Sequence, residues 1–170
     1  MNNLILIGMP SAGKSTIGVL LAKKMGYDFI DTDLLIQKQE RKLLRELIGE
    51  HGSEGFLEIE NQVNRDLEAE KAVIAPGGSV VYCEEAMQHY KEIGTIVYLK
   101  VSYPDIKRRI GNPKRRGVVL AEGQTLLDLY NERSVLFEKY ADIIIDEGSL
   151  SLEDTITKVL HDLSCDADEK

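Results

Sequence analysis

The sequence predicts an α/β domain in which a mostly parallel sheet is covered by helices on both faces. Short apolar runs alternate with longer segments of helical periodicity along the whole chain. One apolar run leads directly into a glycine-rich loop and a helix, and no linker or internal repeat divides residues 1–170. Alternating strands and helices are typical of three-layer sheets, so we expect one domain.

Composition narrows the class of partner. The 170 residues include 43% hydrophobic and 29% charged residues, as in ordinary soluble domains. The net charge of −8 argues against duplex nucleic acid or an anionic membrane as the main partner. The first apolar run lacks a basic leader and is too short to span a bilayer. We therefore expect a cytoplasmic monomer that acts on a small molecule.

The first third of the chain predicts two strands and a helix, followed by a helical region. Residues 4–8, LILIG, form an apolar run typical of a strand buried on both faces. Residues 14–26 carry an apolar stripe at helical spacing, and Gly26 ends that helix. Residues 27–33 predict a second strand. Residues 34–70 are helical in pattern, with a break near IGEHGSEG.

The remainder of the chain continues the alternation. Strands are predicted within residues 72–81, 95–101 and 142–146, and helices at 84–94, 103–110, 125–141 and 151–163. The acidic tail is expected to fray. Residues 111–124 lack periodicity and are rich in Gly, Lys and Arg, so we expect a mobile loop there.

The segment GMPSAGKST predicts a phosphate-binding loop. Gly8, Gly13, Lys14 and Ser15 match the pattern G-x-x-x-x-G-K-[S/T] between a buried strand and a helix. Glycines let backbone N–H groups curl around phosphate oxygens, and the following helix adds its positive N-terminal end. The lysine can reach the terminal phosphates, and the serine hydroxyl can bind Mg²⁺. An unrelated glycine-rich turn would not require this strand and helix context.

Two aspartates follow the second predicted strand. Asp31 and Asp33 are two residues apart, a spacing that puts both carboxylates on one side of an extended chain. One can hold Mg²⁺ through water while the other accepts a proton from a substrate hydroxyl. Alternatively, Asp33 caps a helix that begins at Leu34, and both interpretations can hold together.

Two further segments follow predicted strands and carry candidate ligand contacts. Gly77 and Gly78 allow the backbone to approach a ligand closely, although a plain tight turn would have the same composition. The basic segment contains Lys107, Arg108, Arg109, Lys114, Arg115 and Arg116. A mobile basic loop can neutralise charge during phosphoryl transfer. The alternatives are a solvated face or a contact with an acidic partner; a nucleic-acid patch lacks the usual interleaved aromatics.

The order of these motifs resembles that of the shikimate kinases. The resembling segments are GMPSAGKSTIG, FIDTD, GFLEIE, VIAPGGSVV, TIVYL, KRRIGN, a basic loop and ERSVLFEKYAD, over about residues 3–145. The resemblance implies a P-loop kinase fold with a five-stranded parallel sheet in the order 2-3-1-4-5. It also implies a mobile lid at 111–124, a substrate-binding region within 34–70, and ATP- and Mg²⁺-dependent phosphorylation of a ring hydroxyl.

The resemblance also implies roles for individual residues. Those corresponding to the ATP phosphate site are Ser11, Ala12, Gly13, Lys14, Ser15 and Thr16. Ser15 and Asp31 correspond to the magnesium ligands, and Asp33 to the residue that contacts the substrate hydroxyls. Gly77 and Gly78 correspond to substrate-contacting glycines. Arg109 corresponds to a residue along the adenine, Arg116 to the lid arginine, and Arg133 to a residue that binds the substrate carboxylate.

Three departures from the family pattern concern the acceptor site and the lid. Leu57 stands where the family usually has an arginine that binds the substrate carboxylate. The lid sequence RPLL is RGVV at residues 116–119, and the glycine triplet is Gly77-Gly78-Ser79 after Pro76. Leucine in place of arginine removes a bidentate carboxylate contact and leaves an apolar wall.

Four functions therefore remain at this point. The first is phosphorylation of shikimate, and the second is the same chemistry on another polyol or hydroxy acid. The third is a nucleoside monophosphate kinase, which would need more arginines than Arg41, Arg45 and Arg65 within residues 34–70. The fourth is a nucleotide-binding module without catalysis. For Arg133, considered without the resemblance, an ion pair with Glu132 or Glu138 is the alternative.

Overall fold

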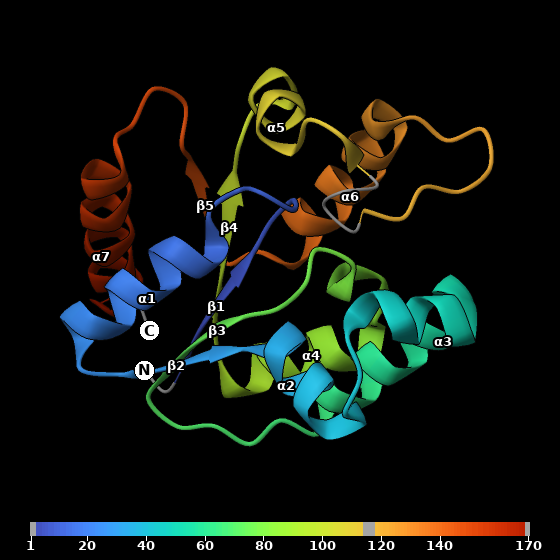
Figure 1. Ribbon diagram of the computed structural model, residues 1–170. Helices are drawn as coiled ribbons and strands as arrows, with labels where there is room; N and C mark the ends of the chain where they lie inside the picture. Colours follow the sequence, from blue (N-terminus) through green and yellow to red (C-terminus); the bar gives the residue numbers. More distant parts are fainter. Residues whose placement is uncertain (1–2, 114–117, 169–170) are drawn as a thin grey trace.

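Five parallel strands form one sheet between two layers of helices in the computed structural model, which describes residues 3–113 and 118–168 (Figure 1). The strands are β1 (Asn3–Ile7), β2 (Asp28–Asp31), β3 (Ala72–Ala75), β4 (Gly94–Lys100) and β5 (Ile143–Asp146). Their order in the sheet is β2-β3-β1-β4-β5, and every neighbouring pair is parallel. The predicted fold class and strand order are confirmed.

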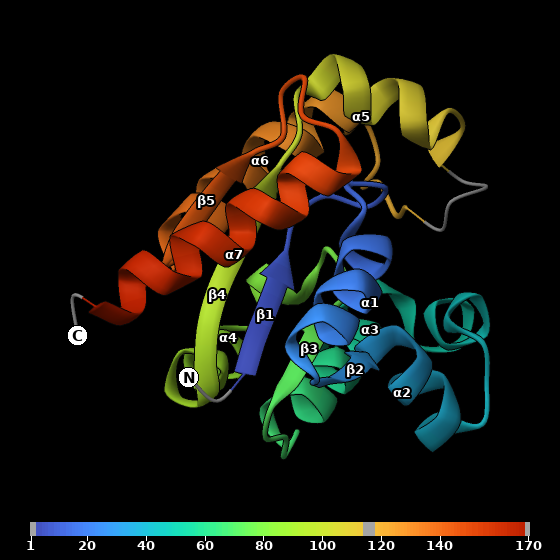
Figure 2. The ribbon, with the colours of Figure 1, turned by 90° about the vertical axis from the view of Figure 1, so that its left-hand side faces the viewer.

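The helices divide between the two faces of the sheet. On one face lie α1 (Lys14–Met25) and α7 (Leu152–Asp168), which stand in front of the strands in Figure 2. The other face is covered by α4 (Glu84–Ile93) and α6 (Leu126–Tyr140), with a short 3₁₀ turn, η1 (Val80–Tyr82). The remaining helices are α2 (Thr32–Glu40), α3 (Leu44–Arg65) and α5 (Tyr103–Ile110). None of the described helices is long and apolar enough to cross a membrane.

Strand β1 is apolar throughout because both of its faces are buried. Leu4 and Leu6 belong to the core beneath α1 and α7, whereas Ile5 and Ile7 belong to the core beneath α4 and α6. Successive side chains of a strand point to opposite faces, so a central strand between two helical layers contains no polar alternation. The strand holds the loop after Ile7 at the carboxyl edge of the sheet.

Asn3 fixes the beginning of the central strand. Its side chain is fully buried, its Nδ2 donates to the carbonyls of Ala69 at 2.8 Å and Ile93 at 3.0 Å, and its Oδ1 accepts from the Ala72 N–H at 3.0 Å. Asn3→Ala removes the side-chain partner of these three backbone groups, of which the Ala72 N–H is buried and the two carbonyls are partly buried. We expect the free energy of unfolding to fall by about 3 kcal/mol, measured by urea denaturation.

The exposed Asn131 on α6 is the matched control for this substitution. Asn131→Ala should change the free energy of unfolding by less than about 0.5 kcal/mol. Equal urea midpoints for Asn3→Ala and the unmodified protein would show that the three hydrogen bonds add nothing to stability.

Some predicted boundaries are wrong. Strand β2 ends at Asp31 rather than at residue 33, because the Asp31 side chain accepts hydrogen bonds from the N–H groups of Asp33 and Leu34 and so begins α2 at Thr32. The break predicted near residues 48–55, in contrast, is confirmed: it lies at Gly52, whose φ of 69° interrupts α3. Helix α7 continues to Asp168 instead of fraying after residue 163.

Candidate functional site

The loop between β1 and α1 curls around the N-terminus of α1. Gly13 has a φ of 98°, which glycine adopts without a steric penalty, and Ser11 also has a positive φ of 65°. The Ala12 N–H donates to the Met9 carbonyl at 3.1 Å, which closes the turn. The unpaired N–H groups at the start of α1 form an anion-binding position at its N-terminus.

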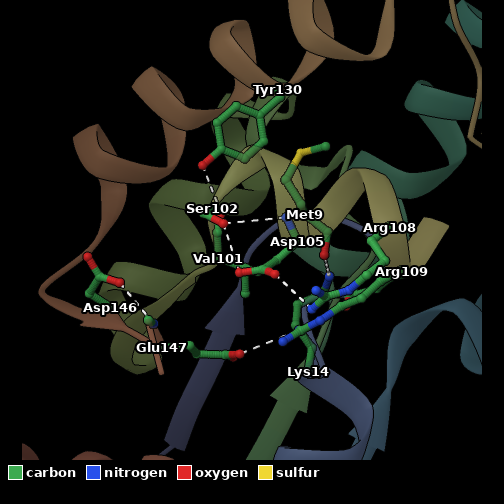
Figure 3. A network of polar contacts seen from close by, with 12 residues as sticks. Met9, Lys14, Val101, Ser102, Asp105, Arg108, Arg109, Tyr130, Asp146 and Glu147 are labelled. Atoms are coloured by element: carbon green, nitrogen blue, oxygen red, sulfur yellow. Dashed lines mark hydrogen bonds and ion pairs between the residues drawn. The ribbon is translucent and has the colours of Figure 1, made fainter. Parts of the chain in front are cut away.

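Lys14 folds back across this loop (Figure 3). Its Nζ donates to the carbonyls of Gly8 at 2.8 Å and Met9 at 3.0 Å. Burial lowers the pKa of the amine to about 8, while the carboxylate of Asp33 acts in the opposite direction. The ammonium is therefore still charged at neutral pH, and among the described residues its hydrogen-bond partners are two neutral carbonyls. An incoming phosphate can replace them as a stronger partner.

Asp31 joins the loop to the second strand. Its Oδ2 accepts a hydrogen bond from the Ser15 hydroxyl at 3.2 Å, while its Oδ1 caps α2. The pair of oxygen donors fits a hard cation such as Mg²⁺, which takes few protein ligands and completes its shell with water and phosphate oxygens. The described residues contain no cluster of three acidic, histidine or cysteine ligands.

Asp33 lies in the first turn of α2 and faces the same cleft as Lys14. Burial raises the pKa of its carboxyl to about 6, with the charge of Asp31 adding to the increase and that of Lys14 opposing it. The interpretation that Asp33 caps a helix starting at Leu34 is wrong, since Asp31 is the cap and α2 starts two residues earlier. The side chain of Asp33 is thereby left available to a ligand.

The turn after β3 lies between charged side chains of three different helices. A Cβ atom on Gly77 would lie 2.9 Å from both Asp33 Oδ1 and Glu60 Oε1. A Cβ atom on Gly78 would lie 2.9 Å from Pro10 Cδ and 3.0 Å from an Arg133 Nη1 nitrogen. Only glycine fits at these two positions without displacing those groups. The two glycines therefore allow Asp33, Glu60 and Arg133 to approach the turn closely.

Arg133 on α6 has only 7% of its surface exposed. Its guanidinium lies over the ring of Tyr82, with 5.5 Å from the guanidinium carbon to the ring centre. Its Nε has no hydrogen-bond partner among residues 3–113 and 118–168. The alternative ion pairs are wrong: Glu132 accepts from the Tyr82 hydroxyl, and Glu138 pairs with Lys100 at 2.9 Å. A buried arginine with a free donor suits an anionic ligand.

One cleft of about 1010 Å³ brings most of the predicted residues together. Its lining includes Ser11, Gly13, Lys14, Ser15, Thr16, Asp31, Asp33, Gly77, Gly78 and Arg133. Gly8 and Ala12 belong to the loop without lining the cleft. The lid arginine Arg116 lies outside the described residues, as do the other residues of 114–117.

Arg109 also lies outside the lining of the cleft, on α5 (Figure 3). Its Nη1 donates to the Ser11 carbonyl at 3.4 Å and lies 3.5 Å from Glu147 Oε2. The guanidinium thus contacts the back of the phosphate loop and the end of β5. The resemblance implies that Arg109 lies along the adenine, and that contact stays a prediction.

The lining of the cleft also includes a set of apolar side chains, which we call the apolar wall. The side chains that form it are Leu44, Ile48, Phe56, Leu57, Val118 and Leu129. Leu57 is half-buried and packs against the core beneath α4 and α6. Among the described residues lining the cleft, the basic ones are Lys14, Arg45 and Arg133, and Arg45 is exposed on α3. No second buried arginine accompanies Arg133 in that described lining.

The sequence did not predict a role for Glu60, which lies next to the cleft-lining residue Ser79. Glu60 is 1% exposed, and its Oε2 accepts a hydrogen bond from the Ser79 hydroxyl at 2.6 Å. Burial raises the pKa of Glu60 to about 7. The available signal was helical spacing: Glu60 comes four residues after Phe56 and three before Val63 on the buried face of α3. A glutamate in an apolar stripe marks an unusual position.

Comparisons with known proteins agree on one family. A family profile described as shikimate kinase matches residues 10–164. The shikimate kinase of Thermodesulfovibrio yellowstonii is 33% identical over 165 residues, which are 95% of each chain. That of Clostridium botulinum strain Loch Maree is 38% identical over 148 residues, which are 85% of this chain and 87% of the relative. A solved shikimate kinase from Acinetobacter baumannii in complex with shikimate superposes with a TM-score of 0.89 at 27% identity, over 98% of this chain and 94% of that one.

Proposed function

The chain belongs to the shikimate kinase family, and we propose that it transfers the γ-phosphoryl group of ATP to a ring hydroxyl of shikimate. One observation carries the proposal most directly: a single cleft is lined by the phosphate loop, by the carboxyl of Asp33 and by the buried cation Arg133. Phosphoryl transfer needs little covalent chemistry from the protein, so positioned charges of this kind are sufficient machinery.

On the nucleotide side, Lys14 and the loop from Ser11 through Thr16 bind the phosphate chain and offset its charge. Ser15 and Asp31 hold Mg²⁺. When bound, the ion would neutralise part of the negative charge on the phosphate oxygens. Arg109 lies along the base, and Arg116 closes from the lid segment 111–124. The ion pair between Arg109 and Glu147 supports this assignment because it restrains the guanidinium beside the loop.

On the acceptor side, Asp33 accepts the proton of the attacking hydroxyl, and Gly77 and Gly78 allow the acceptor to approach the turn. The raised pKa of Asp33, about 6, leaves the carboxyl ionised at neutral pH and close to the range suited to a base. Arg133 binds the acceptor carboxylate. Its unpaired Nε and its stacking on Tyr82 support this role. Residues 34–70 form the acceptor side within a single domain.

A second candidate is the same transfer to a less anionic polyol, and the apolar wall around Leu57 favours it. A carboxylate bound by Arg133 alone has one charged contact and an apolar neighbour. Incubation of the protein with ATP, Mg²⁺ and either shikimate or a panel of uncharged polyols separates the two, with ADP release as the measurement. Turnover of shikimate below about 0.01 s⁻¹ alongside faster turnover of a polyol would replace the first candidate by the second.

Leu57→Arg adds a second cation to the apolar wall. We expect the KM for shikimate to fall about tenfold or more, because a charged hydrogen bond to the carboxylate is gained. The KM for the uncharged methyl ester of shikimate should stay unchanged. Leu57→Met, which keeps the volume and polarity, is the control and should leave both KM values near those of the unmodified protein. An unchanged KM for shikimate in Leu57→Arg would place the acceptor carboxylate elsewhere.

A further inference from the structure

Glu60 is a buried carboxyl beside the cleft to which the proposed transfer assigns no role. Its Oε2 accepts from Ser79, but its Oε1 is buried and has no hydrogen-bond partner among the described residues. No described lysine, arginine or histidine forms an ion pair with it. Burying such a group without a counter-charge is unfavourable, so its position beside the cleft points to function rather than to stability.

The carboxyl of Glu60 contacts the glycine turn, which consists of Gly77, Gly78 and Ser79. Its Oε2 accepts a hydrogen bond from the Ser79 hydroxyl. Its Oε1 and Asp33 Oδ1 both lie near the position that a Cβ atom of residue 77 would occupy. Both carboxyls would lie 2.9 Å from a Cβ atom at that point. A change in the charge or place of the Glu60 side chain therefore acts directly on the turn that separates Asp33 from Arg133.

The charges around Glu60 are those of the proposed acceptor and phosphate sites. The positive charges of Arg133 and Lys14 favour its ionised form, and the negative charge of Asp33 disfavours it. Two groups next to it on the α4 side, Cys83 and Tyr90, stay neutral near pH 7 because burial raises the pKa of the thiol to about 12 and that of the phenol well above its usual value.

We propose that Glu60 is a positioning residue of the acceptor site: it fixes the glycine turn through Ser79, and the gain or loss of its proton sets how strongly Arg133 attracts a negatively charged acceptor. The inference rests on the proposed function, because it requires an acceptor that carries a carboxylate. An ionised Glu60 offsets part of the positive field of Arg133. A protonated Glu60 leaves that field intact.

The direction of the pH dependence follows from linkage. Burial raises the pKa of Glu60 to about 7 in the free protein, and a bound carboxylate nearby raises it further. Binding of an anionic acceptor therefore takes up a proton. Affinity is greatest below about pH 7 and falls as the pH rises through the pKa of Glu60.

The test compares the unmodified protein with Glu60→Gln, which keeps the size and the acceptor for Ser79 but cannot ionise. Between about pH 6 and pH 8 shikimate itself stays ionised, since an ordinary carboxyl titrates near pH 4. Over this range we expect the KM of the unmodified protein for shikimate to rise about fivefold to tenfold and that of Glu60→Gln to rise less than about threefold, the remaining rise coming from Asp33, whose pKa of about 6 lies at the lower end of the range. The methyl ester, which carries no charge, should show no such rise in either protein.

Two further measurements separate an electrostatic role from a structural one. Titration calorimetry in buffers of different ionisation enthalpy should detect proton uptake when shikimate binds to the unmodified protein near pH 7, and none with Glu60→Gln. Ser79→Ala keeps the carboxyl but removes the hydroxyl that ties it to the turn. It should raise the KM for shikimate and for the methyl ester alike, and the rise of the shikimate KM with pH should remain.

The outcomes distinguish this inference from the proposed function. Turnover of shikimate with the same KM–pH profile in Glu60→Gln as in the unmodified protein overturns the role of Glu60 and leaves the kinase assignment intact. Absence of shikimate turnover at every pH overturns the proposed acceptor and the inference together. An equal change in KM for both acceptors without any change in the pH profile would also overturn it, because a merely structural role predicts that pattern.

Discussion

Lys14→Met is expected to reduce kcat for phosphoryl transfer at least about a thousandfold. Methionine keeps most of the aliphatic stem but removes the ammonium, which donates to the carbonyls of Gly8 and Met9. During transfer, negative charge moves onto the phosphate oxygens, and a fixed cation in a partly buried cleft stabilises that charge far more than it would in water. The loss should appear mainly in kcat and less in the KM for shikimate.

Lys24→Met is the matched control, because Lys24 is an exposed lysine in the last turn of the same helix. It should leave kcat within about twofold of the unmodified protein, as expected for a surface change. Coupled measurement of ADP release gives both parameters, and thermal unfolding checks that Lys14→Met is folded. A folded Lys14→Met protein with near-normal kcat would remove the ammonium from the proposed mechanism.

Local sequence patterns were sufficient to predict the phosphate-binding loop and the alternation of strands and helices. The loop motif occupies consecutive residues, and its chemistry depends on backbone N–H groups that any chain with this spacing presents. The order of the strands needed more than periodicity, and the resemblance to a known family supplied it. The observed order confirms that expectation.

Contacts between distant segments were not accessible from local patterns. Arg133 was expected either in an ion pair with a near neighbour or at a substrate carboxylate, yet its ring partner is Tyr82, about fifty positions away in the sequence. Glu60 and Ser79 meet only because α3 packs against the turn after β3. Helical periodicity indicates which face of a helix is buried but not which loop covers it.

The boundary between β2 and α2 shows how one capping bond decides a local structure. Asp31 and Asp33 have the spacing that an extended chain would place on one side, but Asp31 accepts from the N–H of Asp33 and turns the chain into a helix at Thr32. Both carboxyls still line the cleft. Asp31 lines the cleft from the end of β2, and Asp33 lines it from the start of α2. The two carboxyls therefore have different positions, one suited to a metal ligand and the other to a base.

Asp33→Asn is the substitution that tests this separation. We expect kcat to fall about 10²- to 10⁴-fold, because the amide can still accept a hydrogen bond from the acceptor hydroxyl but cannot take its proton. Binding of ATP should persist, since the loop and the pair of Ser15 and Asp31 are unchanged. Equilibrium binding of ATP and initial rates with shikimate measure the two effects independently.

The assay pH matters, because the Asp33 carboxylate raises the pKa of Lys14 against the effect of burial. Asp33→Asn removes that support, so more of the Lys14 amine is neutral above pH 8 than in the unmodified protein. Rates are therefore compared at several values between about pH 6 and pH 8: loss of the base lowers kcat at every pH, whereas loss of charge on Lys14 lowers kcat more as the pH rises. Asp28→Asn, at the exposed start of strand β2, which precedes α2, is the control and should retain kcat. If Asp33→Asn retained kcat as well, proton transfer to this carboxyl would not limit the reaction, and the assignment of Asp33 as the base would be wrong.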